Sequence, residues 1–151
     1  MGLRACGSCL DASMRSCKEA ANNAFDACTR DRKKTLIITA VLNAIGAIVV
    51  SSTALTTENY NRREWWSDVA VHVLNAVTCS AEAITPTSAP KPIKSMLAIA
   101  TSATIFANKA RLAAIGVSVF YNTQTIPAIP EAIDVVNHIQ ALAVLQKYGT
   151  K

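Results

Sequence analysis

The sequence is poor in charged and aromatic residues, which make up 17% and 5% of its 151 positions. It has only two histidines, so a nucleophile, a base and an orienting group cannot be assembled from local spacing. It also lacks a Gly-rich phosphate loop and a zinc-protease helix motif. We therefore predict that the chain is not an enzyme, and we expect no cofactor.

Glycine and proline are scarce too, with five of each, whereas alanine occurs 26 times. This balance favours helices over a turn-rich β-sandwich. Hydrophobic residues make up 51% of the chain, which excludes disorder as its main state and is enough for one sizeable core. The predicted fold class is all-α, with much of the surface in contact with lipid or with other protein chains.

The net charge of +5 is spread too thinly for a nucleic-acid-binding stripe, so no specific nucleic-acid partner is expected. Positive charge is concentrated in residues 30–34 and at Lys91 and Lys94. Each of these clusters borders an apolar segment, as basic residues do on the cytoplasmic side of membrane spans. The charge pattern therefore predicts a membrane protein whose N-terminus lies on the cytoplasmic side.

Residues 1–34 are predicted to form an amphipathic helix with a basic end. Four of the five cysteines lie here, and three of them are spaced by 11 residues: Cys6, Cys17 and Cys28. On one helix these thiols share a face but stand about 16 Å apart, too far to pair with each other. We expect them to be free. A four-thiolate zinc site that includes Cys9 is the alternative, but it requires a break in the helix.

Residues 35–57 carry the strongest signal, 23 consecutive uncharged positions. At about 1.5 Å per residue they would cross a hydrocarbon layer of roughly 30 Å. Basic residues precede the segment, and Tyr60, Trp65 and Trp66 follow it, as is typical of membrane interfaces. We predict a transmembrane helix in contact with the lipid bilayer; the alternative is a wholly buried core helix.

The faces of this helix differ in side-chain size. Large aliphatic residues share one face: Ile38, Val41, Leu42, Ile45, Ile48 and Val49. Small residues share the other, and a small face lets another helix come close. Asn43 is expected to bond across to a second helix, because a buried amide needs a partner. The predicted helix-packing residues are Ala40, Asn43, Ala44, Ala47 and Ser51.

A second helix over 67–85 completes an apolar hairpin, residues 35–85. Its polar residues recur at steps of three and four: Asp68, His72, Asn75, Cys79 and Glu82. Asp68 and Glu82 are almost four turns apart and cannot share one ion, so we expect a polar or oligomer-facing stripe and no metal site. Three prolines in 86–94 form a linker.

Residues 95–151 are predicted to form two further helices, broken near Pro127 and Pro130. In the first, an apolar seam at heptad-like spacing lies opposite a polar stripe. Charges in the middle of this helix argue against free exposure to lipid. We therefore predict that copies associate through the seam and turn the stripe toward a lumen or groove lined by Thr104, Asn108 and Arg111. In the second helix, Asp134 and His138 are spaced to form a local pair.

Together these features predict a non-enzymatic, membrane-embedded helical subunit of an oligomeric assembly, structural or channel-forming, such as a virion or secretion-apparatus component. The alternative is a soluble, Ala-rich structural protein of a filament or virion layer, whose apolar faces are covered by other subunits.

Overall fold

The computed structural model describes residues 30–56, 62–121 and 129–150, together with separate residues between 15 and 26. In this part of the chain the regular secondary structure is helical, without strands, so the all-α prediction is confirmed. Residues 1–31 and 32–151 form two compact units. The described residues between 15 and 26 are helical, but Cys6, Cys9, Cys17 and Cys28 lie outside the described residues.

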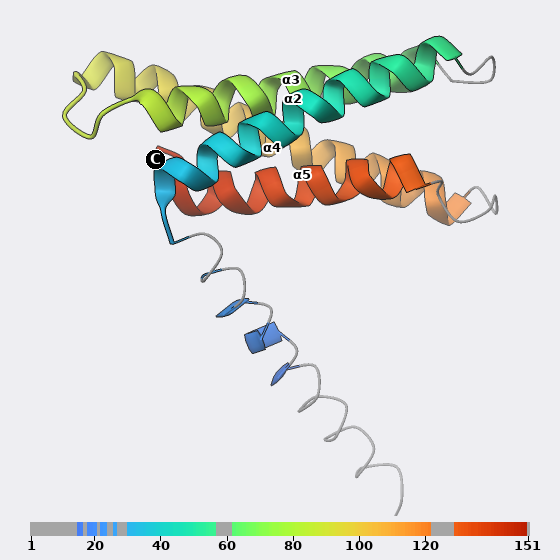
Figure 1. The fold of residues 1–151 in the computed structure, drawn as a ribbon, viewed down its shortest axis with the longest axis horizontal. Coiled ribbons are helices and arrows are strands. Elements are labelled where there is room, and N and C mark those ends of the chain that lie inside the picture. Colours follow the sequence, from blue (N-terminus) through green and yellow to red (C-terminus); the bar gives the residue numbers. More distant parts are fainter. Residues whose placement is uncertain are drawn as a thin grey trace, which may run out of the picture. The chain divides into compact units, whose positions relative to one another are not determined.

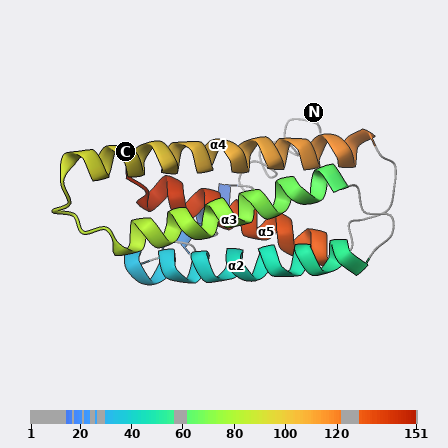
Figure 2. The same cartoon turned by 90° about the horizontal axis from the view of Figure 1, so that it is seen from above.

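The larger unit is a bundle of four long helices: α2 (Arg32–Thr56), α3 (Arg62–Ile84), α4 (Lys91–Tyr121) and α5 (Ile129–Tyr148). Successive helices run in opposite directions, and α5 returns to lie beside α2 (Figures 1 and 2). Each helix therefore has one side that faces the centre of the bundle and one that faces outward. The predicted hairpin of residues 35–85 corresponds to α2 and α3.

The helix ends follow local chemistry. Pro86 follows α3, and the chain turns there with a hydrogen bond from Ala89 N to Pro86 O of 3.0 Å. The predicted linker 86–94 is too long, because α4 already begins at Lys91. Pro92 is tolerated in the first turn, where its missing N–H would have no partner within the helix. Gly149 directly follows α5, and its N–H donates to Leu145 O at 2.9 Å.

The interior of the bundle is unusually polar. Eight of the twelve largest fully buried side chains are polar, among them His72, His138 and Glu82. Meanwhile every helix exposes large apolar side chains. Examples are Ile48 at 65% exposure, Val77 at 61%, Phe106 at 73% and Val136 at 61%. The usual distribution of a water-soluble domain is thus largely reversed.

On α2, the faces match the prediction in most respects. All six large aliphatic residues predicted to share a face are exposed. Of the predicted packing residues, Ala40 and Asn43 are buried, and Ala47 and Ser51 are half-buried. Ala44 is exposed, because it lies one position beyond Asn43 and therefore about 100° around the helix. Within one chain it does not belong to the packing face.

Within the described ranges, Arg32–Ser52 is the one stretch that is helical, long and apolar enough to cross a membrane by length and composition. The core helix of a soluble protein meets the same criterion.

Candidate functional site

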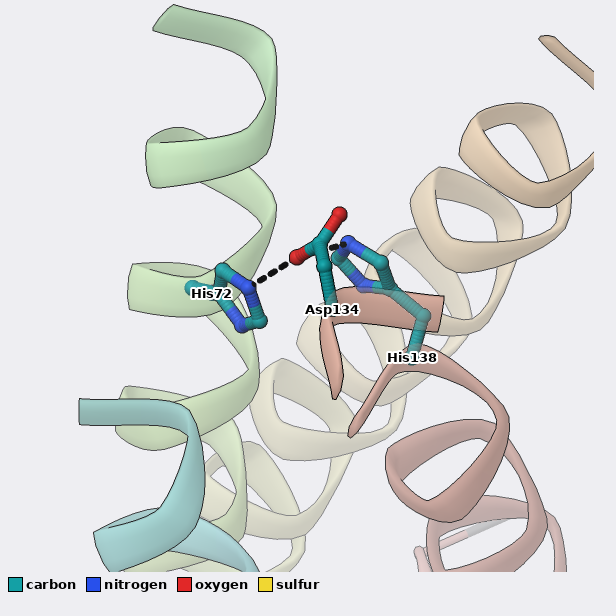
Figure 3. Close-up of side chains that lie close together, drawn as sticks. All are labelled: His72, Asp134 and His138. Carbon is teal, nitrogen blue, oxygen red and sulfur yellow. Dashed lines mark hydrogen bonds and ion pairs between the residues drawn. The ribbon is translucent and has the colours of Figure 1, made fainter. Parts of the chain in front are cut away.

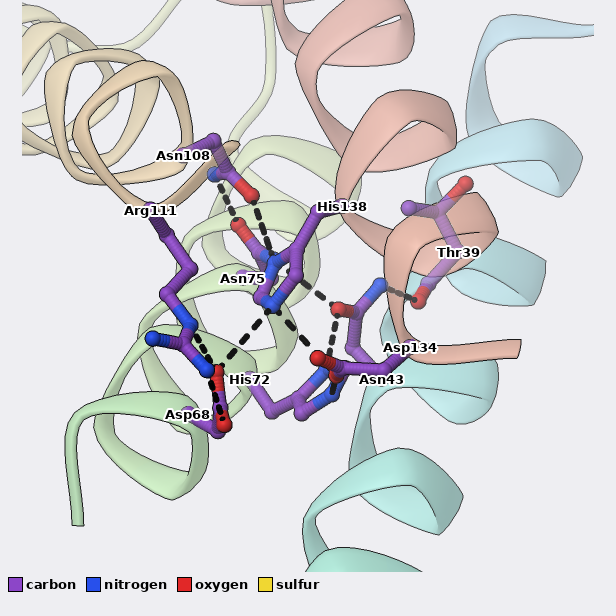
Figure 4. Close-up of polar contacts among 9 residues, drawn as sticks. All are labelled: Thr39, Asn43, Asp68, His72, Asn75, Asn108, Arg111, Asp134 and His138. Carbon is purple, nitrogen blue, oxygen red and sulfur yellow. Dashed lines mark hydrogen bonds and ion pairs between the residues drawn. The ribbon is translucent and has the colours of Figure 1, made fainter. Parts of the chain in front are cut away.

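Three asparagines tie the helices together at the centre of the bundle (Figure 4). Asn43 on α2, Asn75 on α3 and Asn108 on α4 are fully buried. Asn75 Nδ2 donates to Asn43 Oδ1 at 2.9 Å and to Asn108 Oδ1 at 3.1 Å. Asn108 Nδ2 donates in return to Asn75 Oδ1 at 2.6 Å. Asn43 therefore does reach a second helix, as its position within an apolar segment led us to expect.

The orientation of two of these amides is fixed by main-chain carbonyls. Asn43 Nδ2 donates to Thr39 O at 2.9 Å, and Asn108 Nδ2 donates to Thr104 O at 2.8 Å. A carbonyl oxygen can only accept a hydrogen bond, so the amide NH₂ groups must face these carbonyls. The two amide oxygens are consequently turned toward the histidines.

Both histidines are held through Nδ1. His72 Nδ1 lies 2.9 Å from Asn43 Oδ1, and His138 Nδ1 lies 3.1 Å from Asn108 Oδ1. An amide oxygen is an acceptor only, so each ring must carry a proton on Nδ1. In the neutral ring, Nε2 then carries no proton and is an acceptor.

The two Nε2 atoms face the same carboxylate (Figure 3). His72 Nε2 is in hydrogen-bond contact with Asp134 Oδ1, and His138 Nε2 lies 3.4 Å from the same oxygen. The rings of His72 and His138 are stacked, with centroids 4.6 Å apart and planes inclined by 16°. The predicted proximity of Asp134 and His138 is thus observed, and His72 joins them from a helix 62 residues earlier in the sequence.

Next to this triad, Arg111 on α4 pairs with Asp68 on α3. Arg111 Nη2 lies 2.5 Å from Asp68 Oδ2, and Arg111 Nε contacts Oδ1 of the same carboxylate. The Arg111 side chain is 15% exposed and that of Asp68 only 3%. The charge of Arg111 is therefore compensated within its own chain.

The predicted lumen residues all lie along the interior of a single bundle. Thr104 and Asn108 are buried, and Thr104 Oγ1 is 2.8 Å from Thr78 Oγ1 of α3. Arg111 is mostly covered. A lumen between copies concerns an assembly and stays a prediction. Within one chain, these side chains already have partners.

A second polar cluster surrounds Glu82 near the end of α3. This fully buried carboxylate accepts hydrogen bonds from Arg32 Nη2 at 2.9 Å and from Thr101 Oγ1 at 2.7 Å. The N–H and Oγ1 of Thr150 add two more, at 2.5 and 2.9 Å. The cluster joins α2, α3, α4 and the residues after α5. Glu82 therefore acts as a structural anchor.

The centre of the bundle is the part suited to chemistry, because one oxygen and two nitrogens converge there. One ring nitrogen of His72, one ring nitrogen of His138 and one carboxylate oxygen of Asp134 all lie within 4.8 Å of one another. The sequence showed Asp68 and His72 on one stripe and Asp134 and His138 as a local pair on a later helix, but not that the stripe and the pair meet. The available signal was the recurrence of polar residues on one face of each apolar helix.

Comparisons with protein families, with curated proteins and with solved structures find no match for this chain. Its function is therefore argued from its own residues.

Proposed function

We propose that the chain is a non-enzymatic, membrane-embedded helical subunit that turns its aliphatic surface to lipid and keeps its polar side chains inside. The observation that carries this proposal is the reversed distribution of side chains over all four helices. In water, so large an apolar surface is a strong liability unless something covers it. In a bilayer, the same surface is matched by the lipid tails, and polar groups are favoured in the interior of the bundle.

Helix length supports the proposal. The helices contain 25, 23, 31 and 20 residues. At about 1.5 Å per residue, each is at least about 30 Å long, which is the thickness of a typical hydrocarbon core. Polar residues lower the hydropathy of α3, α4 and α5, but many of these residues point into the bundle, where they do not meet lipid.

The charges support an orientation. Lys33 and Lys34 at the start of α2 and Lys91 at the start of α4 are exposed. These helix starts lie at the same end of the bundle, where Arg32 reaches Glu82 (Figure 2). Trp66, 62% exposed, lies at the beginning of α3 and thus at the other end. By the positive-inside rule, the lysine-rich end is cytoplasmic.

Oligomerisation is the second part of the proposal. Lys109 is exposed on α4, close to the exposed side chain of Phe106. A lysine facing the centre of a bilayer would cost about 2.5–3.5 kcal/mol. We therefore assign the outer face of α4 to contacts with another copy of the chain and the outer face of α2 to lipid.

Lys109 is also the observation that favours the second candidate, a soluble Ala-rich structural protein whose apolar faces are covered by neighbouring subunits. In a filament or virion layer, no part of α4 would meet hydrocarbon. The two candidates differ in what covers the outer face of α2, and this difference can be measured.

The test is extraction of the full chain from the cells that express it. We expect the protein to stay in the membrane pellet through high-salt and alkaline washes and to require detergent for release. Release of the protein by the alkaline wash alone would contradict the membrane proposal and support the soluble assembly.

A pair of variants at Ile48 sharpens this test. Ile48→Glu should reduce the amount of protein in the washed pellet, because it places a charge against lipid. Ile48→Phe keeps the surface apolar and should leave this amount unchanged. Equal retention of both variants would show that lipid does not cover this face.

A further inference from the structure

We propose that His72, Asp134 and His138 bind one divalent transition-metal ion of the zinc class. The three donor atoms come from α3 and α5 and converge in the interior of the bundle (Figure 3). Both histidine side chains are fully buried, and that of Asp134 is 10% exposed. The site belongs to a single chain, so the proposal does not depend on the membrane or on oligomerisation.

The first argument is that the tautomers are fixed in the form that a metal needs. The main-chain carbonyls of Thr39 and Thr104 orient Asn43 and Asn108, whose amide oxygens accept the Nδ1 protons of the two histidines. Metal-bound histidines characteristically donate their other ring N–H in this way, which fixes the orientation of the ring. Nε2 of each ring is thereby left as the metal-binding nitrogen, 3.4 Å from Asp134 Oδ1 in His138 and closer to it in His72.

The second argument is that three acceptors converge in a buried site, where one cation between them can satisfy all three. One proton shared by His72 and Asp134 would satisfy only one histidine. His138 Nε2 is fully buried and has no hydrogen-bond partner. A proton on both rings would place two like charges on imidazoles stacked at 4.6 Å. A single metal ion satisfies all three donor atoms.

The third argument is distance. Tetrahedral coordination with bonds of about 2.0–2.1 Å separates neighbouring ligand atoms by roughly 3.3–3.4 Å. His138 Nε2 and Asp134 Oδ1 are already 3.4 Å apart. His72 Nε2 lies closer to the carboxylate and must draw back as the ion enters. The two stacked rings must also rotate, so that the ion lies in the plane of each ring.

The donor set indicates the class of ion. Two imidazole nitrogens and one carboxylate oxygen suit zinc and its first-row neighbours, whereas Ca²⁺ and Mg²⁺ prefer oxygen ligands alone. Three protein ligands leave a fourth position for water. Asp68 lies nearby, with Oδ1 3.9 Å from His138 Nε2, but its charge is balanced by Arg111. The Asp68–Arg111 pair therefore adds no net charge to the site.

The stripe formed by Asp68, His72, Cys79 and Glu82 predicted no metal, because its outer members are too far apart. The proposed site contains one member of that stripe, His72, and its other two ligands, Asp134 and His138, come from α5. The proposed site does not include the N-terminal cysteines. The test must therefore distinguish metal bound at the proposed site from metal bound by these cysteines.

The test uses Co²⁺ as a spectroscopic substitute for Zn²⁺ in the full-length, purified chain with Cys6, Cys9, Cys17 and Cys28 replaced by serine. After treatment with a chelator, we expect one Co²⁺ per chain, with the visible absorption of a four- or five-coordinate ion. Absence of stoichiometric Co²⁺ binding would overturn the proposal.

Matched variants locate the ion. Loss of an outer-shell partner typically costs about 10–100-fold in metal affinity, so His138→Gln and Asp134→Asn should each cost about 100-fold or more. Thr78→Val removes a buried hydroxyl outside the site and should retain the affinity. Unchanged Co²⁺ binding by both ligand variants would exclude this site.

A second measurement keeps the test decisive if the ligand variants do not fold. Zn²⁺ binding to the folded state should raise the unfolding temperature of the chain with the four N-terminal cysteines replaced, followed by circular dichroism. An unfolding temperature that is the same with Zn²⁺ and with chelator would overturn the proposal without any ligand variant.

Discussion

Gly46 on α2 lies directly against the imidazole ring of His72 on α3. A Cβ atom at position 46 would be 2.8 Å from His72 Cε1 and 3.1 Å from Nε2. The close approach of the two helices at this level therefore depends on the absence of a side chain. Gly116 on α4 is a natural comparison, because a Cβ atom there would meet nothing within 4 Å.

Gly46→Ala should destabilise the bundle by about 1–3 kcal/mol, because the ring of His72 must shift to make room. Gly116→Ala should be neutral or stabilising by up to about 1 kcal/mol, since alanine is the better helix former. Chemical unfolding of both variants in detergent, followed by circular dichroism, measures the difference. Equal stability of the two variants would show that His72 is not held against Gly46.

Asn43→Leu should destabilise the bundle far more than Ile48→Leu. Removal of the Asn43 amide leaves the Nδ1–H of His72 and one of the two Nδ2–H groups of Asn75 without an acceptor, at about 1–3 kcal/mol for each buried group. Ile48 is exposed, and exchange of its side chain for an isomer should cost less than about 1.5 kcal/mol. Similar unfolding midpoints would contradict the hydrogen-bond network.

Ala44→Leu separates contacts within a chain from contacts between copies. Ala44 is exposed, so the variant should leave the stability of the single bundle within about 0.5 kcal/mol of the parent. If Ala44 packs against another copy, the mass of the detergent-solubilised particle should fall. A loss of bundle stability with an unchanged particle mass would contradict the exposed position.

Arg111→Glu should destabilise the bundle by about 3–5 kcal/mol, because it replaces an ion pair with two facing carboxylates. Exchange of the two charges, Asp68→Arg with Arg111→Asp, should recover part of the loss in a double-mutant cycle. Lys109→Glu is the control and should leave the stability of the bundle nearly unchanged. If Arg111→Glu unfolds at the parent's midpoint, Arg111 does not act through Asp68.

Glu82→Gln should cost about 1.5–3 kcal/mol, because the uncharged amide loses the charge-assisted bond to Arg32 and turns an NH₂ group toward other donors. Thr101→Val removes only one of these donors and should cost about 1 kcal/mol. The same unfolding measurement ranks the two variants. A larger loss in Thr101→Val would contradict the central position of Glu82.

Much of this fold could be predicted because helix periodicity is local. The length and apolar character of residues 35–57, the break at Pro86 and the end near Gly149 follow from neighbouring residues. The polar stripe of Thr104, Asn108 and Arg111 was also visible in the sequence. The surroundings of this stripe could not be predicted, since a polar stripe can face water, a lumen or the interior of its own bundle.

The sequence by itself determined the helices and which residues share a face within each of them, because a rotation of 100° per residue depends on nothing else. Only the tertiary structure decided which faces meet. His72 and Asp134 are 62 residues apart, and their contact depends on how α3 and α5 are rotated about their axes. That rotation is set by packing across all four helices. The close approach at Gly46, the asparagines that bridge the helices, and the burial of the polar faces in one common interior all contribute to it.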